Sequence, residues 1–176
     1  PLSREPAFIL EQKYAGETTA SKLARIREYM RNCGANVHVL TTIDDICWTL
    51  NIRGNDIEFF PLVLSYAIIT MDRMHLYIDE TKLSDEMKEV LAADDVVLHP
   101  YNDIYEDIKA YGEGDCLLLD PVRVNYAMYS NISDKVRKVE ERNPEILFKA
   151  VKNAVEIENM RRGQIEESVA DVRVME

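Results

Sequence analysis

Short apolar runs alternate along this chain with stretches whose apolar residues recur at helical spacing. We expect strands within residues 37–40, 61–70, 73–78, 95–98, 116–119 and 135–139. We expect helices near residues 18–33, 42–50, 84–91, 102–111 and 125–129. Strands that alternate with helices are typical of a sheet covered on both faces. The pattern therefore predicts an α/β fold with a mixed β-sheet flanked by helices.

Local signals add detail to this prediction. The runs 61–70 and 73–78 follow each other at once, so we expect a tight antiparallel hairpin. Thr42 and Ser84 carry side chains that can cap the helices that follow them. Residues 1–17 show no periodic pattern and are expected to be irregular.

The C-terminal stretch behaves differently from the rest. A helical segment begins at 143–145, and Asn153 is a candidate cap for a second, strongly charged helix. Its apolar residues form an interrupted stripe of Ile157, Ile165, Val169 and Val172. Two interpretations stay open: a helix packed on the domain, or the first helix of a further domain.

Composition excludes several classes of function. Among the 176 residues, 21 Lys and Arg face 32 Asp and Glu, which gives a net charge of −11. Such a chain is a poor candidate for binding nucleic acid or an anionic membrane, since both need clustered cations. No apolar run is long enough to span a bilayer. The chain starts at Pro1 without a signal-peptide pattern, so we expect that its ends are not natural ones.

The three cysteines and three histidines offer no recognisable catalytic centre. The cysteines are odd in number and far apart, and Cys47 and Cys116 lie in apolar stretches that predict buried, inert thiols. This pattern fits a reducing, cytoplasmic compartment. The sequence holds no HExxH, GxSxG, GxGxxG or Walker-type motif. We therefore expect the histidines to be structural or solvated.

The densest group of candidate functional residues lies between positions 44 and 56, after a predicted strand. Trp48 and Arg53 on one loop could bind a carboxylate or a peptide end by stacking and forked hydrogen bonds. Alternatively, Trp48 fills the core and Arg53 pairs with Asp56, while Asp44 and Asp45 cap the helix. The spacing alone favours this structural alternative.

Two weaker possibilities concern the same region. Asp44, Asp45 and Asp56 with Glu58 could form a hard oxygen site for Mg²⁺ or Ca²⁺, although their spacing matches no calcium loop. The pair 59–60, two phenylalanines, is either a contact patch or the buried start of the hairpin.

Several short segments carry a resemblance to one protein family. They are residues 13–18, 21–27, 42–48, 51–57, 76–79, 100–102, 120–121, 125–126, 143–144, 149–153 and 156–161. Taken in order they resemble the second domain of the three-domain Xaa-Pro aminopeptidases (aminopeptidase P). The resemblance covers nearly the whole chain, which makes it far more specific than any single motif.

The resemblance implies a creatinase/prolidase N-terminal-type fold and two parts. Residues 1–152 would be the non-catalytic domain, and 153–176 the first helix of a truncated "pita-bread" catalytic domain. In the family that following domain holds two divalent metal ions (Mn, Zn or Co) on Asp, His and Glu ligands. This chain stops before those ligands, so we expect no catalytic residue, metal or cofactor in it. It also departs from the family pattern at Gly163-Gln164, where relatives usually carry Ala-His.

The resemblance also implies a role. Such domains shape access to the active site of an enzyme that removes the residue preceding proline, and they contribute to oligomer contacts. Expected partners are the chain's own C-terminal catalytic domain, peptides with proline at the second position, and a second copy in a homo-oligomer such as a dimer. Trp48, Asn51, Arg53 and Asp56 match the family motif and are expected to face the substrate entrance or the neighbouring domain.

Two other functions remain open at this stage. The chain could be a stand-alone binding or assembly module without peptidase activity. It could also be a small hydrolase that uses Asp44, Asp45 and an adventitious metal ion.

Overall fold

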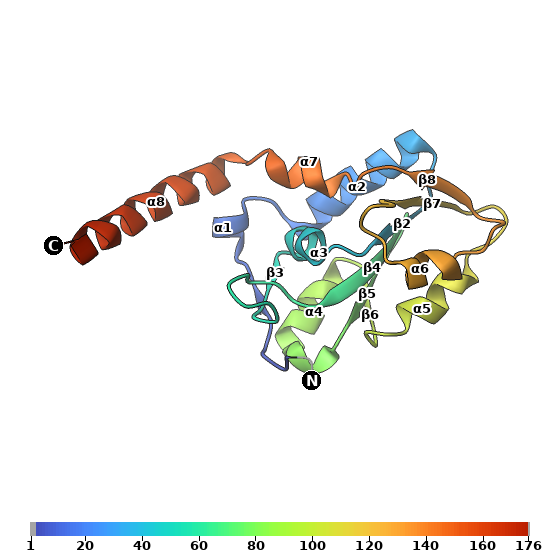
Figure 1. Cartoon of the computed structure of the whole chain (residues 1–176), viewed down its shortest axis with the longest axis horizontal. Helices are drawn as coiled ribbons and strands as arrows, with labels where there is room; N and C mark the ends of the chain where they lie inside the picture. Colours follow the sequence, from blue (N-terminus) through green and yellow to red (C-terminus); the bar gives the residue numbers. More distant parts are fainter. Residues whose placement is uncertain (1–2, 176) are drawn as a thin grey trace.

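The structure is a computed structural model that describes residues 3–175. A six-stranded sheet in the order β6-β5-β4-β2-β7-β8 forms its centre (Figure 1). The strands are β2 (Val37–Leu40), β4 (Ser65–Thr70), β5 (Met74–Ile78), β6 (Val96–His99), β7 (Cys116–Leu119) and β8 (Arg137–Glu140). β4 pairs antiparallel with β2 and β5, whereas β2–β7, β5–β6 and β7–β8 are parallel. The predicted mixed sheet and the predicted hairpin are both confirmed.

Helices cover both faces of this sheet. They are α2 (Thr19–Cys33), α3 (Ile43–Leu50), α4 (Asp85–Ala93), α5 (Ile104–Asp107), α6 (Tyr126–Asn131) and α7 (Glu145–Ala150). The core on one face contains residues of α2, α3 and α4, and the core on the other contains residues of α5 and α6. Successive side chains of a strand point to opposite faces, so Leu117 and Leu118 of β7 belong to different cores.

The first residues are more ordered than the sequence predicts. β1 (Phe8–Ile9) pairs antiparallel with β3 (Ile52–Arg53), and α1 (Gln12–Ala15) follows it. The strand predicted from position 61 begins only at Ser65, because the amide of Leu64 donates to Asp56 Oδ2 rather than to a neighbouring strand. Pro61 has no N–H to donate to a ladder.

The predicted helix caps are confirmed in part. Ser84 Oγ accepts a hydrogen bond from the Met87 amide at 3.2 Å. Thr42 occupies the capping position of α3, but its hydroxyl donates to the Asp45 carboxylate and makes no capping bond. Asn153 forms a reciprocal capping box, because its Oδ1 accepts from the Glu156 amide while Glu156 Oε2 accepts from the Asn153 amide.

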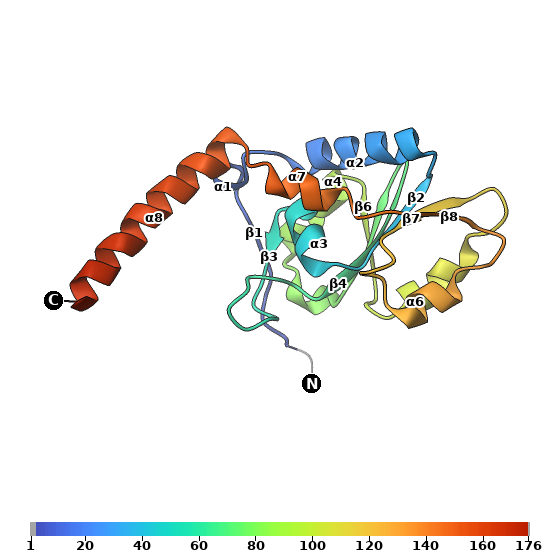
Figure 2. The same cartoon turned by 45° about the horizontal axis from the view of Figure 1, so that its top comes forward.

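The last helix, α8 (Ala154–Met175), extends away from the domain (Figures 1 and 2). Its polar contacts with the rest lie near its start, where the Asn153 and Asn159 amide groups donate to the carbonyl oxygens of Ala15 and Lys13. No residue of α8 is buried. The interpretation of this segment as a helix packed along the domain is therefore wrong for most of its length. No helix in residues 3–175 is long and apolar enough to cross a membrane.

Candidate functional site

The candidate site begins where α3 ends. Asn51 takes a left-handed backbone conformation with φ of 54° and terminates the helix through its own N–H. Asparagine tolerates this conformation better than most residues. Because β3 starts at the next residue, the turn sets Trp48, Asn51 and Arg53 close to one another on two short elements.

Lys22 of α2 lies at the centre of this group, and the sequence reasoning did not single it out. Its side chain is almost fully buried, and Nζ donates to the Trp48 carbonyl oxygen at 2.7 Å and to Asn51 Oδ1 at 2.6 Å. Nζ also lies 4.4 Å from the centre of the Trp48 ring, within the range of a cation–π contact. Burial lowers the pKa of Lys22 to about 8.

A second cation lies near the same indole. The Arg25 guanidinium lies 5.6 Å from the Trp48 ring centre and 4.6 Å from that of Phe148 in α7. Its Nη2 donates to Glu17 Oε2 at 3.1 Å. Trp48 is thus buried, as the structural alternative predicted, but it also connects α2, α3 and α7 through its neighbours.

Arg53 does not pair with Asp56, so that part of the structural alternative is wrong. Its Nη1 donates to the carbonyl oxygens of Cys47 at 2.9 Å and Ile52 at 2.8 Å. Burial lowers the pKa of Arg53, and the Glu156 carboxylate in the first turn of α8 opposes that shift. The same carboxylate favours the charged form of Lys22. The negative charge of Glu156 at the start of α8 therefore favours the charged forms of both Lys22 and Arg53.

A close contact between the Gly16 backbone and the Asn153 side chain holds the start of α8 against α1. Gly16 ends α1 with φ of 70°, and a Cβ atom built on it would overlap the Asn153 side chain. Asn153 Nδ2 donates to the Ala15 carbonyl oxygen at 2.8 Å. Only glycine fits this position without strain. We call the set Lys22, Trp48, Asn51, Arg53, Asn153 and Glu156 the junction, because it joins the domain to α8.

Asp56 lies outside the junction. Its Oδ2 accepts hydrogen bonds from Lys82 Nζ at 2.6 Å and from the Leu64 amide at 2.7 Å. Both side chains of this ion pair are nearly inaccessible to solvent. Asp56 therefore fixes a loop, and its expected role at the substrate entrance or the neighbouring domain stays a prediction.

The carboxylates weighed as a Mg²⁺ or Ca²⁺ site are not assembled. Asp44 and Asp45 both bind Lys149 of α7, while Asp56 binds Lys82. Across residues 3–175 no three His, Cys, Asp or Glu side chains are arranged to hold a metal ion. The described residues therefore do not fit a pair of divalent metals.

The predicted environment of the thiols is confirmed. Cys47 and Cys116 are buried and unpaired. Burial raises the pKa of both thiols, which keeps them protonated and unreactive.

The profile of the Creatinase/Prolidase N-terminal domain family matches residues 1–156. The chain belongs to this family. The predicted resemblance is thereby confirmed at the level of the domain, since the matched residues include the whole six-stranded sheet.

Curated relatives are much longer than this chain. A probable Xaa-Pro aminopeptidase P of Neurospora crassa is 36% identical over 98% of this chain, which covers 27% of that protein. Xaa-Pro aminopeptidase 1 of Dictyostelium discoideum is 35% identical over 96% of this chain, which covers 26% of that protein. The chain therefore spans about a quarter of their length.

Solved structures likewise match this chain to only part of a longer chain. An X-prolyl aminopeptidase of Caenorhabditis elegans, described as a cytosolic enzyme with a di-nuclear active site, superimposes with a TM-score of 0.92 at 31% identity. That match covers 97% of this chain and 29% of the nematode chain. An Xaa-Pro dipeptidase of Bacillus anthracis, with a TM-score of 0.57 at 15% identity, shares the fold.

Proposed function

We propose that this chain is the non-catalytic domain of a metal-dependent Xaa-Pro aminopeptidase. The observation that carries the proposal is the superposition on the nematode X-prolyl aminopeptidase over 97% of this chain but only 29% of that one. The reaction is the removal of an N-terminal residue that precedes proline, and peptides with proline at the second position are the proposed substrates. The proposed location is the cytoplasm.

The chemistry belongs to a part of the enzyme beyond this chain. We assign residues 1–152 to the non-catalytic domain and 153–176 to the first helix of the catalytic domain. Two divalent metal ions (Mn, Zn or Co), bound by that catalytic domain, would activate water and polarise the scissile carbonyl group. The departure of α8 from the domain at Ala154 supports this division.

The domain's own contribution is positioning. The junction helps to fix the direction of α8, because Asn153 donates to Ala15 of α1 and the Glu156 carboxylate in its first turn interacts electrostatically with Lys22 and Arg53. Trp48, Asn51 and Arg53 are therefore proposed as interdomain residues, and Asp56 as the anchor of a loop. Restricting access to the active site and contributing to homo-oligomer contacts are the roles that family membership suggests.

Replacement of Arg53 tests this proposal. In the full-length gene product, Arg53→Ala should lower kcat/KM for an Xaa-Pro peptide about 10-fold, because a small misplacement of catalytic groups is costly. The melting temperature should change little. Arg73→Ala, in the exposed β4–β5 turn, is the matched control and should leave kcat/KM unchanged. Unchanged kinetics with lost stability in Arg53→Ala would assign Arg53 a purely structural role.

The stand-alone module remains the alternative function. A reading frame that ends near residue 176 would support it, and a frame that continues for several hundred residues would exclude it. The length of the curated relatives favours the longer frame.

A further inference from the structure

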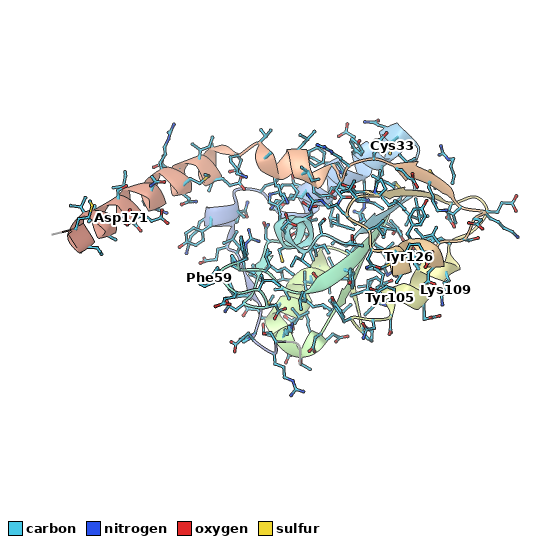
Figure 3. All side chains as sticks on the ribbon, in the orientation of Figure 1. Cys33, Phe59, Tyr105, Lys109, Tyr126 and Asp171 are labelled. Atoms are coloured by element: carbon cyan, nitrogen blue, oxygen red, sulfur yellow. The ribbon has the colours of Figure 1, made fainter. Side chains whose placement is uncertain are left out.

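Two neighbouring phenylalanines are exposed on the loop between β3 and β4. Phe59 is 91% exposed and Phe60 is 62% exposed. Figure 3 shows Phe59 pointing outward from the domain on the side from which α8 departs. We call residues 54–64 the aromatic loop. Large apolar side chains exposed next to each other commonly mark a contact surface.

The aromatic loop is held in place at several points. The buried Lys82–Asp56 pair ties it to the short 3-10 turn η1 (Glu80–Lys82). Backbone bonds cross it from Gly54 N to the Pro61 oxygen at 3.4 Å and from Asp56 N to the Leu62 oxygen at 3.1 Å. The exposed phenylalanines are thus presented by a well-anchored loop, which reduces the entropy that docking would cost.

The backbone at Phe59 is strained as well. Its φ of 69° lies in the left-handed region, which a bulky L-residue rarely adopts. Strained residues of this kind persist where the surrounding contacts force them, and they cluster at functional sites. Here the Phe60 amide donates to the Ile57 carbonyl oxygen at 3.1 Å. This bond closes a tight turn, and Phe59 points outward from it.

The position of the loop indicates what covers it. In both ribbon views the aromatic loop and α8 lie on the same side of the domain (Figures 1 and 2). α8 thus directs any polypeptide that follows Met175 toward that side. The curated relatives hold about three quarters of their length outside the matched region, and the proposed function places a catalytic domain among that length, after α8.

We propose that Phe59 and Phe60 dock against the segment that follows residue 176 in the same polypeptide. This inference rests on the proposed function, since it requires that a further domain follows α8. The two phenylalanines would form a second contact between the domains, separate from the junction, and together the two contacts would fix their relative orientation.

Photo-cross-linking in the full-length gene product tests the inference. Phe59→p-benzoylphenylalanine should cross-link to residues numbered above 176 of the same chain, at a yield that does not depend on protein concentration. The matched control is Tyr126→p-benzoylphenylalanine, because Tyr126 is 85% exposed but lies on the far side of the domain (Figure 3). It should give at least 10-fold less of that product.

Three results would overturn the inference: no cross-link, a cross-link to residues that precede the domain, or one that forms only between two copies. A peptidase assay of the unmodified product separates this inference from the proposed function. Xaa-Pro cleavage without the Phe59 cross-link refutes the docking alone, while the cross-link without cleavage refutes the proposed function alone.

Discussion

The Lys22 ammonium group donates a hydrogen bond to the carbonyl oxygen of Trp48 while lying 4.4 Å from the centre of the same residue's ring. A buried cation is thus compensated by two oxygen acceptors and an aromatic face. These contacts are weaker than a direct carboxylate partner, which explains why burial lowers the pKa of Lys22 to about 8.

This lowered pKa predicts a pH dependence of stability. Between pH 8 and about 10.5, the ordinary pKa of lysine, the unfolded chain binds the proton that the folded chain has lost. The free energy of unfolding should therefore increase as the pH rises through this window. Urea unfolding at pH 7.5 and 9.5 should show this gain in the wild type but not in Lys22→Met. Parallel changes in the two proteins would contradict the prediction.

The approach of Gly16 to Asn153 predicts a specific cost. Gly16→Ala requires a left-handed alanine and a Cβ that overlaps the Asn153 side chain, so it should destabilise the chain by about 2 kcal/mol. It should also speed hydrogen exchange in the first turn of α8. Gly112→Ala is the control, because a Cβ at Gly112 meets nothing within 4 Å. Equal unfolding free energies for the two variants would show that Gly16 is not constrained.

The buried His38–Glu145 pair predicts that the free energy of unfolding falls as the pH rises. His38 Nε2 lies 3.3 Å from Glu145 Oε2, and His38 Nδ1 lies 3.0 Å from the Leu118 carbonyl oxygen. Burial opposes the charge on His38, but Glu145 outweighs it and the pKa of His38 is raised. The stabilisation is therefore fully present below pH 6.5, the ordinary value, and is lost as pH rises through the raised folded-state pKa.

The test compares wild type with Glu145→Gln. At pH 6 the variant should lose about 3 kcal/mol of unfolding free energy, since removing one partner leaves a buried charge uncompensated. Its stability should then depend less on pH than that of the wild type as the pH is raised above 6.5. Glu113→Gln, at an exposed loop position, should behave like the wild type. Equal pH profiles for all three proteins would mean that His38 is neutral throughout.

The sequence predicts the sheet because its signal is local. Periodicity marks the strands and helices, and the caps at Ser84 and Asn153 are short-range patterns that the structure confirms. The pairing of β1 with β3 was missed because two-residue strands carry no periodic signal. The family resemblance rests on short sequence motifs and not on periodicity or helix caps.

The candidate site was predicted less completely because its contacts are long-range. Lys22 occupies a core-facing position, three residues after Thr19 and four before Ile26, but a lysine there is ordinarily assigned to the surface. The partner of Asp56 lies 26 residues away, at Lys82. No spacing rule connects residues so far apart. The sequence therefore predicts the nearer Arg53 as the partner of Asp56.

Peptidase activity tests the central claim most directly. The full-length gene product and the chain of residues 1–176 should be assayed side by side on an Xaa-Pro peptide with Mn²⁺, Zn²⁺ or Co²⁺. We expect metal-dependent release of the N-terminal residue by the full-length product and none by the shorter chain. Cleavage by residues 1–176 alone, or a full-length product without Xaa-Pro activity under any of the three metals, would contradict the proposed function.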